Sequence, residues 1–168
     1  MQRPLQKIEY VPIGLVRSRY TRRRGTPRQG ALFPDSEGRI EIFKEYKEAL
    51  KDLDSFEYII ILFHFDRVKH WEALVDPPAS NHEHRFGLFS TRSPKRPNPI
   101  GLTVLKLEKI EDSVLYVRGL DAFDGTPVLD IKPYLPSVDL IESRHNEVAE
   151  SRLNRDDGDS DIDGRFSK

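Results

Sequence analysis

The segment Gly87–Thr103 reads GLFSTRSPKRPNPIGLT, and its middle part combines three cationic side chains with three prolines. Pro94, Pro97 and Pro99 each fix the backbone φ angle and remove an N–H donor, which excludes a helix or a central strand. A stiff loop loses little entropy when it binds a ligand, so its cationic and amide side chains are positioned donors. Such donors suit a carboxylate, a phosphate or a nucleobase edge. The segment therefore predicts a rigid binding loop for an anionic or carbonyl-rich ligand.

Histidines offer a second possible chemistry. His64 is the first polar side chain after a long apolar run. Sites are often built where strands end, so His64 is either a functional side chain or a partly buried histidine that bonds to backbone. His82 and His84, with His64, have the residue types of a metal site. The neighbouring prolines and Asn81 place the pair in a loop, and we expect a polar loop without a metal.

Several common chemistries are excluded by the residues present. The chain has no cysteine, which rules out disulfides, thiol nucleophiles and cysteine-bound metal centres. It has no G-x-G-x-x-G fingerprint, so a nucleotide-like cofactor is not held by a dinucleotide-binding turn. Gly25–Gly30 has the glycine spacing of a phosphate loop, but Ala31 and Leu32 stand where that loop needs a lysine and a hydroxyl residue.

Charge is divided along the sequence although the formal net charge is only −1. Six arginines lie between Arg17 and Arg28, and with Gly25 and Pro27 they predict a long basic loop. Five aspartates lie between Asp156 and Asp163. Residues 143–168 have too few apolar side chains to order themselves, so we expect a disordered acidic C-terminal tail.

The elements that must position these residues are mostly strands. Ile8–Arg17 has a strand pattern, and Phe43–Phe56 has apolar residues at the spacing of a short amphipathic helix. Glu57–Phe65 is a continuous β-branched and aromatic run, which is typical of a strand buried on both faces.

Further strands follow the binding loop. Ile100–Ile110 and Val114–Leu120 are joined by a polar turn and predict a hairpin, and Val128–Ile131 adds another strand. Because the strands are not separated by regular helices, we expect residues 1–142 to form one mostly β domain, a small antiparallel β-barrel with one or two short helices. No signal peptide or membrane-spanning run is present, which favours the cytoplasm.

Four blocks in this sequence also carry a family resemblance: PRQ at Pro27–Gln29, the ILFHF strand, GLFSTRSPKRPNPIGLTVLKL and DAFDGTPVLDIKPYLP. In this order, over roughly Ile8–Pro136, they resemble the TsaA-like family of the TrmO tRNA methyltransferases. The resemblance implies a homodimeric β-barrel methyltransferase that uses S-adenosylmethionine and methylates N6 of threonylcarbamoyladenosine beside the anticodon of tRNA. Bacterial members continue into a second, smaller domain where this sequence has its acidic tail, which leaves the mode of tRNA docking open.

The resemblance also implies cofactor contacts where the motifs match. These positions are Pro27, Arg28, Gln29, His64, Phe65, Arg92, Leu102, Asp124, Gly125, Thr126 and Pro127. Phe65 stands where the bacterial motif has glutamine, so one side-chain hydrogen bond is lost there unless the backbone makes the contact.

Methyl transfer is a direct displacement that mainly requires alignment of two bound reactants, and the acceptor nitrogen loses a proton. Asp130 and Tyr134, in the DIKPY sequence, are candidates for the base; alternatively, Asp130 pairs with Lys132 or caps a turn. We expect tRNA to contact cations of the two loops. These are Arg22, Arg23, Arg24, Lys95 and Arg96.

Two other classes of function remain open at this point. A barrel with a basic loop is also typical of an RNA-binding module without catalysis. The three histidines named above would instead suit a metal-dependent hydrolase.

Overall fold

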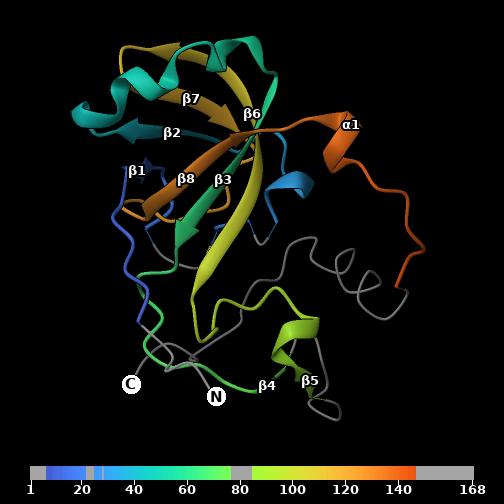
Figure 1. The fold of residues 1–168 in the computed structure, drawn as a ribbon. Coiled ribbons are helices and arrows are strands. Elements are labelled where there is room, and N and C mark those ends of the chain that lie inside the picture. Colours follow the sequence, from blue (N-terminus) through green and yellow to red (C-terminus); the bar gives the residue numbers. More distant parts are fainter. Residues whose placement is uncertain (1–6, 22–24, 28, 77–84, 147–168) are drawn as a thin grey trace, which may run out of the picture.

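Six strands form a closed antiparallel barrel in the order β1-β2-β7-β6-β3-β8 (Figure 1). The computed structural model describes residues 7–21, 25–27, 29–76 and 85–146. The strands are β1 Gly14–Arg17, β2 Glu37–Ile42, β3 Tyr58–His64, β6 Ile100–Glu111, β7 Val114–Arg118 and β8 Pro127–Pro133. This confirms the predicted mostly β barrel. The division into a domain at 1–142 and a tail at 143–168 stays a prediction, since residues 147–168 lie outside the described residues.

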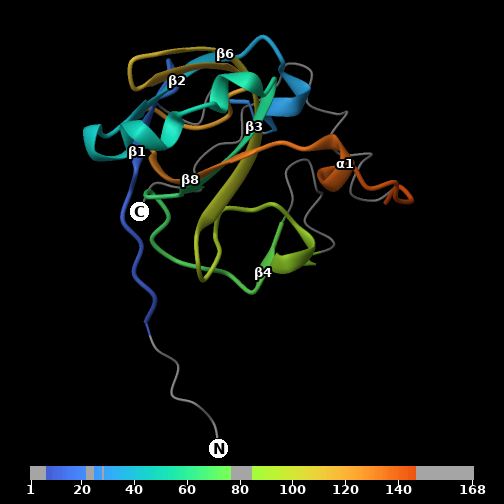
Figure 2. The same ribbon diagram turned by 45° about the horizontal axis from the view of Figure 1, so that its top comes forward.

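Short elements lie in the connections between the barrel strands. They are the 3₁₀ helices η1 Gly30–Leu32, η2 Lys44–Leu50, η3 Leu53–Ser55 and η4 Leu88–Ser90, and the two-stranded sheet of β4 Leu74–Val75 and β5 Phe86–Gly87. The α-helix α1 Pro136–Asp139 follows β8. Figures 1 and 2 both show the β4–β5 sheet standing apart from the barrel, beyond the start of β6. No helix in the described part of the chain is long and apolar enough to cross a membrane.

The core lies inside the barrel because alternate residues of each strand point inward. Ile40, Ile59, Ile61, Leu105 and Leu115 are at most 1% exposed. Their outward neighbours on β3 and β6 remain partly or fully exposed. The prediction that the 57–65 strand is buried on both faces is therefore wrong for a single chain, which covers only the inner face of the barrel.

Two other predicted elements differ from the structure. The helix expected at Phe43–Phe56 is instead the two 3₁₀ helices η2 and η3, separated by Asp52 with a φ of 64°. Three of its apolar residues, Tyr46, Leu50 and Leu53, still pack against the core. The strand expected from Ile8 begins only at Gly14, where pairing with β2 and β8 begins. The β6–β7 hairpin and β8 are confirmed, with Asp112 at a φ of 58° in the hairpin turn.

Candidate functional site

One end of the barrel collects the predicted cofactor positions. β1, β3 and β7 finish at this end, while β2, β6 and β8 begin there, as the pairs Arg17–Arg39 and His64–Ile100 show. Three connections therefore meet at this end: residues 18–36, 65–99 and 119–126. They carry all the predicted cofactor positions except His64, Leu102 and Pro127, which lie on β3, β6 and β8 within three residues of this end.

Gln29 and Arg92 join the first two of these connections. The Nη1 atom of Arg92 donates a hydrogen bond of 2.6 Å to Oε1 of Gln29. Arg92 is exposed, and its remaining N–H groups make no hydrogen bond with other described residues. Pro27 is half-buried beside them in the chain, and Arg28 lies outside the described residues. The structure thus presents a tethered guanidinium with donors available to an anion.

Asp121 ties the first connection to the third. Gly30 N donates a 2.9 Å hydrogen bond to its Oδ2. A Cβ atom on Gly30 would lie 1.7 Å from the carbonyl oxygen of Gly119, so only glycine allows this approach. The Oδ1 atom is shielded from solvent and accepts no hydrogen bond from the described residues. No sequence signal separated Asp121 from a surface aspartate, and its role was missed.

Burial raises the pKa of Asp121, while the Gly30 N–H, the Thr103 hydroxyl and the charge of Arg92 oppose the rise. A raised pKa means that the folded chain holds the proton more tightly than the unfolded chain. This tighter proton binding stabilises the folded chain fully at pH values below 3.8, the ordinary pKa of the side chain. The stabilisation is lost as pH rises through the pKa of the folded state.

Asp121→Asn should therefore change the pH dependence of stability. Below pH 3.8 the unfolding free energy of the variant should be at its lowest relative to that of the wild type. Toward neutral pH the difference should shift in favour of the variant, because asparagine cannot ionise. Chemical denaturation of both proteins across this range measures the difference. A difference in unfolding free energy that stays constant with pH would contradict the assignment.

The DGTP turn is fixed to the end of β1. Oδ1 of Asp124 accepts from Ser18 N at 3.1 Å, and Gly125, at a φ of 81°, donates its N–H to Val16 O at 2.8 Å. Arg67 lies 4.6 Å from the centre of the Phe123 ring and donates to Thr21 O at 2.7 Å. These contacts hold the turn against the first and second connections.

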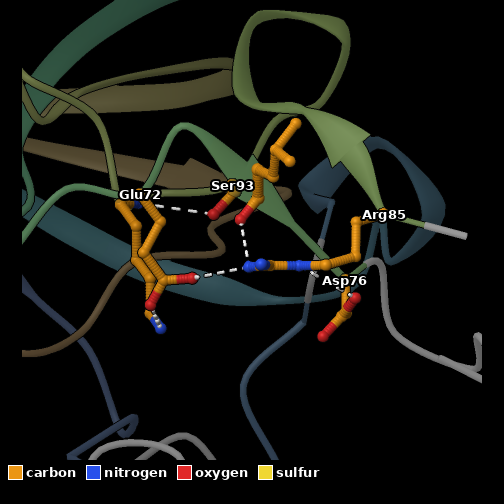
Figure 3. Close-up of polar contacts among 6 residues, drawn as sticks. Glu72, Asp76, Arg85 and Ser93 are labelled. Atoms are coloured by element: carbon orange, nitrogen blue, oxygen red, sulfur yellow. Dashed lines mark hydrogen bonds and ion pairs between the residues drawn. The ribbon is translucent and has the colours of Figure 1, made fainter.

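The RSPKRPNP loop is anchored by a network of ion pairs with the β4–β5 sheet (Figure 3). Arg85 lies between Asp76 and Glu72, with N–O distances of 3.5 and 3.8 Å, and Glu72 also pairs with Lys95. The backbone N–H of Glu72 donates to Lys95 O at 3.2 Å. The loop is thus preformed, as its prolines predict. Lys95 is occupied within the fold, so its predicted contact with RNA would have to compete with Glu72.

The other predicted cofactor residues differ in accessibility. Leu102 is 57% exposed on the outer face of β6, next to Leu62 of β3. His64 is half-buried at the end of β3. The Phe65 ring packs edge-on against Phe63, and its backbone N–H donates to Pro99 O at 2.8 Å. The side chain and the N–H of Phe65 are therefore both used within the fold.

The two candidate bases lie at different positions along the barrel axis. Asp130 pairs with Lys132 at 2.7 Å and stands outward in the same cross-strand row as Leu62 and Leu102. The ion pair expected as an alternative is therefore present. Tyr134 bonds through its N–H to Tyr58 O, at the opposite end of β3 from the site. At about 3.3 Å per residue, the strand separates it from His64 by roughly 20 Å.

Among the described residues, no group of three or more His, Cys, Asp or Glu side chains is close enough together to bind a metal ion. His82 and His84 lie outside the described residues, as do Arg22, Arg23 and Arg24. The hydrolase alternative therefore has no observed site among the described residues.

A groove of about 650 Å³ opens on the outside of β1, β2 and β7. Its charges largely cancel, because Arg17 pairs with Glu41 at 2.7 Å and Arg118 pairs with Glu108 at 3.2 Å. It borders the site end, because Ser18, Arg19 and Asp124 belong to the first and third connections. The Arg92–Gln29 contact is not part of its lining.

Comparison with known proteins identifies the family. The model of the tRNA-methyltransferase O N-terminal domain matches residues 15–140. A probable S-adenosyl-L-methionine-binding protein of Pyrococcus abyssi is 41% identical over 95% of this chain and 85% of its own. The Escherichia coli tRNA (adenine(37)-N6)-methyltransferase is 36% identical over 88% of this chain and 66% of its own.

A crystal structure of TrmO superposes with a TM-score of 0.72 at 36% identity, covering 86% of this chain and 65% of that one. This chain thus spans about two thirds of the length of these two methyltransferases. Sequence and structure agree on one assignment: the chain belongs to the family of the tRNA-methyltransferase O N-terminal domain.

Proposed function

We propose that this protein is an S-adenosylmethionine-dependent methyltransferase that modifies N6 of an adenosine beside the anticodon of tRNA, with threonylcarbamoyladenosine as the acceptor. The observation that carries the proposal is the convergence of the PRQ, TRSPKRPNP and DGTP segments at one end of the barrel. The relatives named above, which include a binding protein for this cofactor and a tRNA methyltransferase, support it.

The donor set at this end fits the cofactor. S-adenosylmethionine carries a carboxylate, a ribose diol and an adenine edge, which require donors and acceptors on rigid segments. Arg92 has exposed N–H groups for the carboxylate, and Gln29 fixes its orientation. Backbone groups of the DGTP turn and the exposed side chain of Leu102 would hold the nucleoside part. When bound, the cofactor supplies the methyl group.

The protein's own part in the reaction is alignment and removal of one proton. The three connections are tied together by Asp121, Asp124 and the Arg92–Gln29 contact, so they hold two reactants in line with little rearrangement. Asp130 is our choice for the proton acceptor, because it shares a row with Leu102 and its carboxylate is oriented by Lys132. Tyr134 of the same chain is too far from this row to serve.

We also propose that the protein is a homodimer that works in the cytoplasm, where its tRNA substrate would be met. The outer face of β3 and β6 is apolar, with Ile60 beside Val104 and Leu62 beside Leu102. Ile100 and Tyr58 at its ends are each 39% exposed. Apolar faces of this kind mark interaction sites. Leu102 is both a proposed cofactor contact and part of this face, so a second copy would help to enclose the ligand.

Binding of S-adenosylmethionine to the purified chain in the presence of a chelator should occur and should require no metal. Titration calorimetry measures it. Mass spectrometry of anticodon-loop nucleosides, from cells with and without the gene, then identifies the acceptor. An RNA-binding module would bind RNA but would not bind the cofactor, and a metal-dependent hydrolase would cleave its substrate only without the chelator. Absence of cofactor binding would overturn the proposal.

A further inference from the structure

Phe89 is among the most exposed large apolar residues of the described chain, at 79%. It lies in η4, three residues before Arg92. The turn that carries it is firmly held, because the neighbouring Leu88 is 3% exposed and donates its N–H to Ala73 O at 2.9 Å. Thr91 N donates in turn to Leu88 O at 3.0 Å. The backbone contacts of Leu88 and Thr91 therefore hold the exposed ring in a defined position.

A guanidinium group accompanies the ring. Arg96 lies 5.5 Å from the centre of the Phe89 ring. Its Nη1 atom donates to Thr91 O at 3.0 Å and to Ser93 O at 3.4 Å, which fixes the side chain in place. The other nitrogens of its guanidinium group make no hydrogen bond with the residues that the structure describes. An aromatic ring beside a cation with spare donors is a surface on which a nucleobase can stack while a phosphate is held.

The charge around this surface favours an anionic partner. Arg96 forms no ion pair with a described carboxylate, whereas Lys95 of the same loop pairs with Glu72. An aromatic ring beside an unneutralised guanidinium suits a partner that offers both a ring to stack and an anion. Unpaired bases of an RNA loop combine both features that the surface requires.

We propose that Phe89 stacks on an unpaired base of the RNA loop and that Arg96 contacts a phosphate next to it. Phe89 would then be a positioning residue, which orients the nucleotide chain so that the acceptor base reaches the cofactor near Arg92. This inference rests on the proposed function for its ligand class. It adds a site that the motif comparison did not supply.

Phe89→Ala should weaken binding of an anticodon stem-loop RNA by about 10- to 100-fold, as expected for the loss of one stacked base. Phe89→Trp should bind as well as the wild type, and Phe89→Leu should bind as poorly as the alanine variant, because leucine keeps apolar area but has no π face. Tyr10→Ala removes another exposed aromatic residue, 65% exposed, from the N-terminal segment and should have no effect. Fluorescence anisotropy with labelled RNA measures all four variants.

A stem-loop with 2-aminopurine in the loop gives a direct signature of stacking. Its fluorescence should be quenched by the wild type and by Phe89→Trp, and not by Phe89→Ala at saturating protein. The proposal is overturned if Phe89→Ala binds RNA normally, if Phe89→Leu behaves like the wild type, or if the alanine variant loses cofactor binding or its dimeric state. Absence of cofactor binding by the wild type would instead refute the proposed function. The RNA-binding measurements would then still test whether Phe89 stacks on a base.

Discussion

Replacing Arg92 with alanine should weaken S-adenosylmethionine binding by about one to two orders of magnitude. A hydrogen bond between a charged arginine and a carboxylate contributes about 1.5–3 kcal/mol, and each 1.4 kcal/mol is about tenfold in affinity. Stability should change little, because Arg92 is exposed and bonds only to Gln29 among the described residues. Titration calorimetry measures the affinity, and thermal unfolding checks the fold.

Arg39→Ala is the matched control for this experiment. Arg39 is also an exposed arginine, but it points outward from β2 and forms no ion pair with a described residue. It should bind the cofactor like the wild type. Arg92→Lys should recover only part of the affinity, because an ammonium group cannot form a paired contact with a carboxylate. Normal cofactor binding by Arg92→Ala would mean that the motif match does not extend to function.

Leu62→Asp should convert the proposed homodimer to a monomer. Leu62 lies at the centre of the outer β3–β6 face, between Leu102 and Asp130 in register. A new carboxylate there would be buried without a partner in the dimer and would face a like charge, at a cost of about 3 kcal/mol or more. The dimer dissociation constant should rise by at least about a hundredfold. Light scattering should show the mass fall from twice the 19.5 kDa of one chain to that value.

Val114→Asp provides a control on β7, beside the end of β6 that is far from Leu102. Val114 also points outward and lies between two carboxylates, Glu41 and Glu111, in register. This variant should remain dimeric. If the wild type is itself a monomer at all concentrations and still binds the cofactor, the dimer proposal fails, and Leu102 must then contact the cofactor within a single chain.

The elements that the sequence predicted well are those with a strong local pattern, namely the apolar strands β3 and β8 and the β6–β7 hairpin. The β6–β7 hairpin depends on two apolar runs joined by a short polar turn, and both partners lie within one stretch of chain. β2 was not predicted. Its sequence EGRIEI has only Ile40 and Ile42 as buried apolar side chains, and it becomes a strand because β1 and β7 supply backbone partners on both sides.

The binding loop shows the same division between local and distant information. Its three prolines predict its rigidity from sequence, whereas the charged residues that anchor it, Glu72, Asp76 and Arg85, flank the distant strands β4 and β5. Residue type alone does not distinguish Arg92 from Arg96, and the family resemblance assigns only Arg92 to the cofactor. In the structure Arg92 bonds to Gln29, while Arg96 is held beside Phe89.

The sequence by itself determined the β class, the stiff donor loop and the family motifs, since these depend on residue types and short spacings. Only the tertiary structure decided which of these residues meet. The Oδ1 atom of Asp121 is shielded from solvent where Gly30 and Gly119 approach closely across 89 positions of the chain, and no local pattern records such a contact. The apolar outer face of β3 and β6 likewise appears only when the barrel closes. A continuous run of apolar residues does not indicate which face of the strand will be buried in the core.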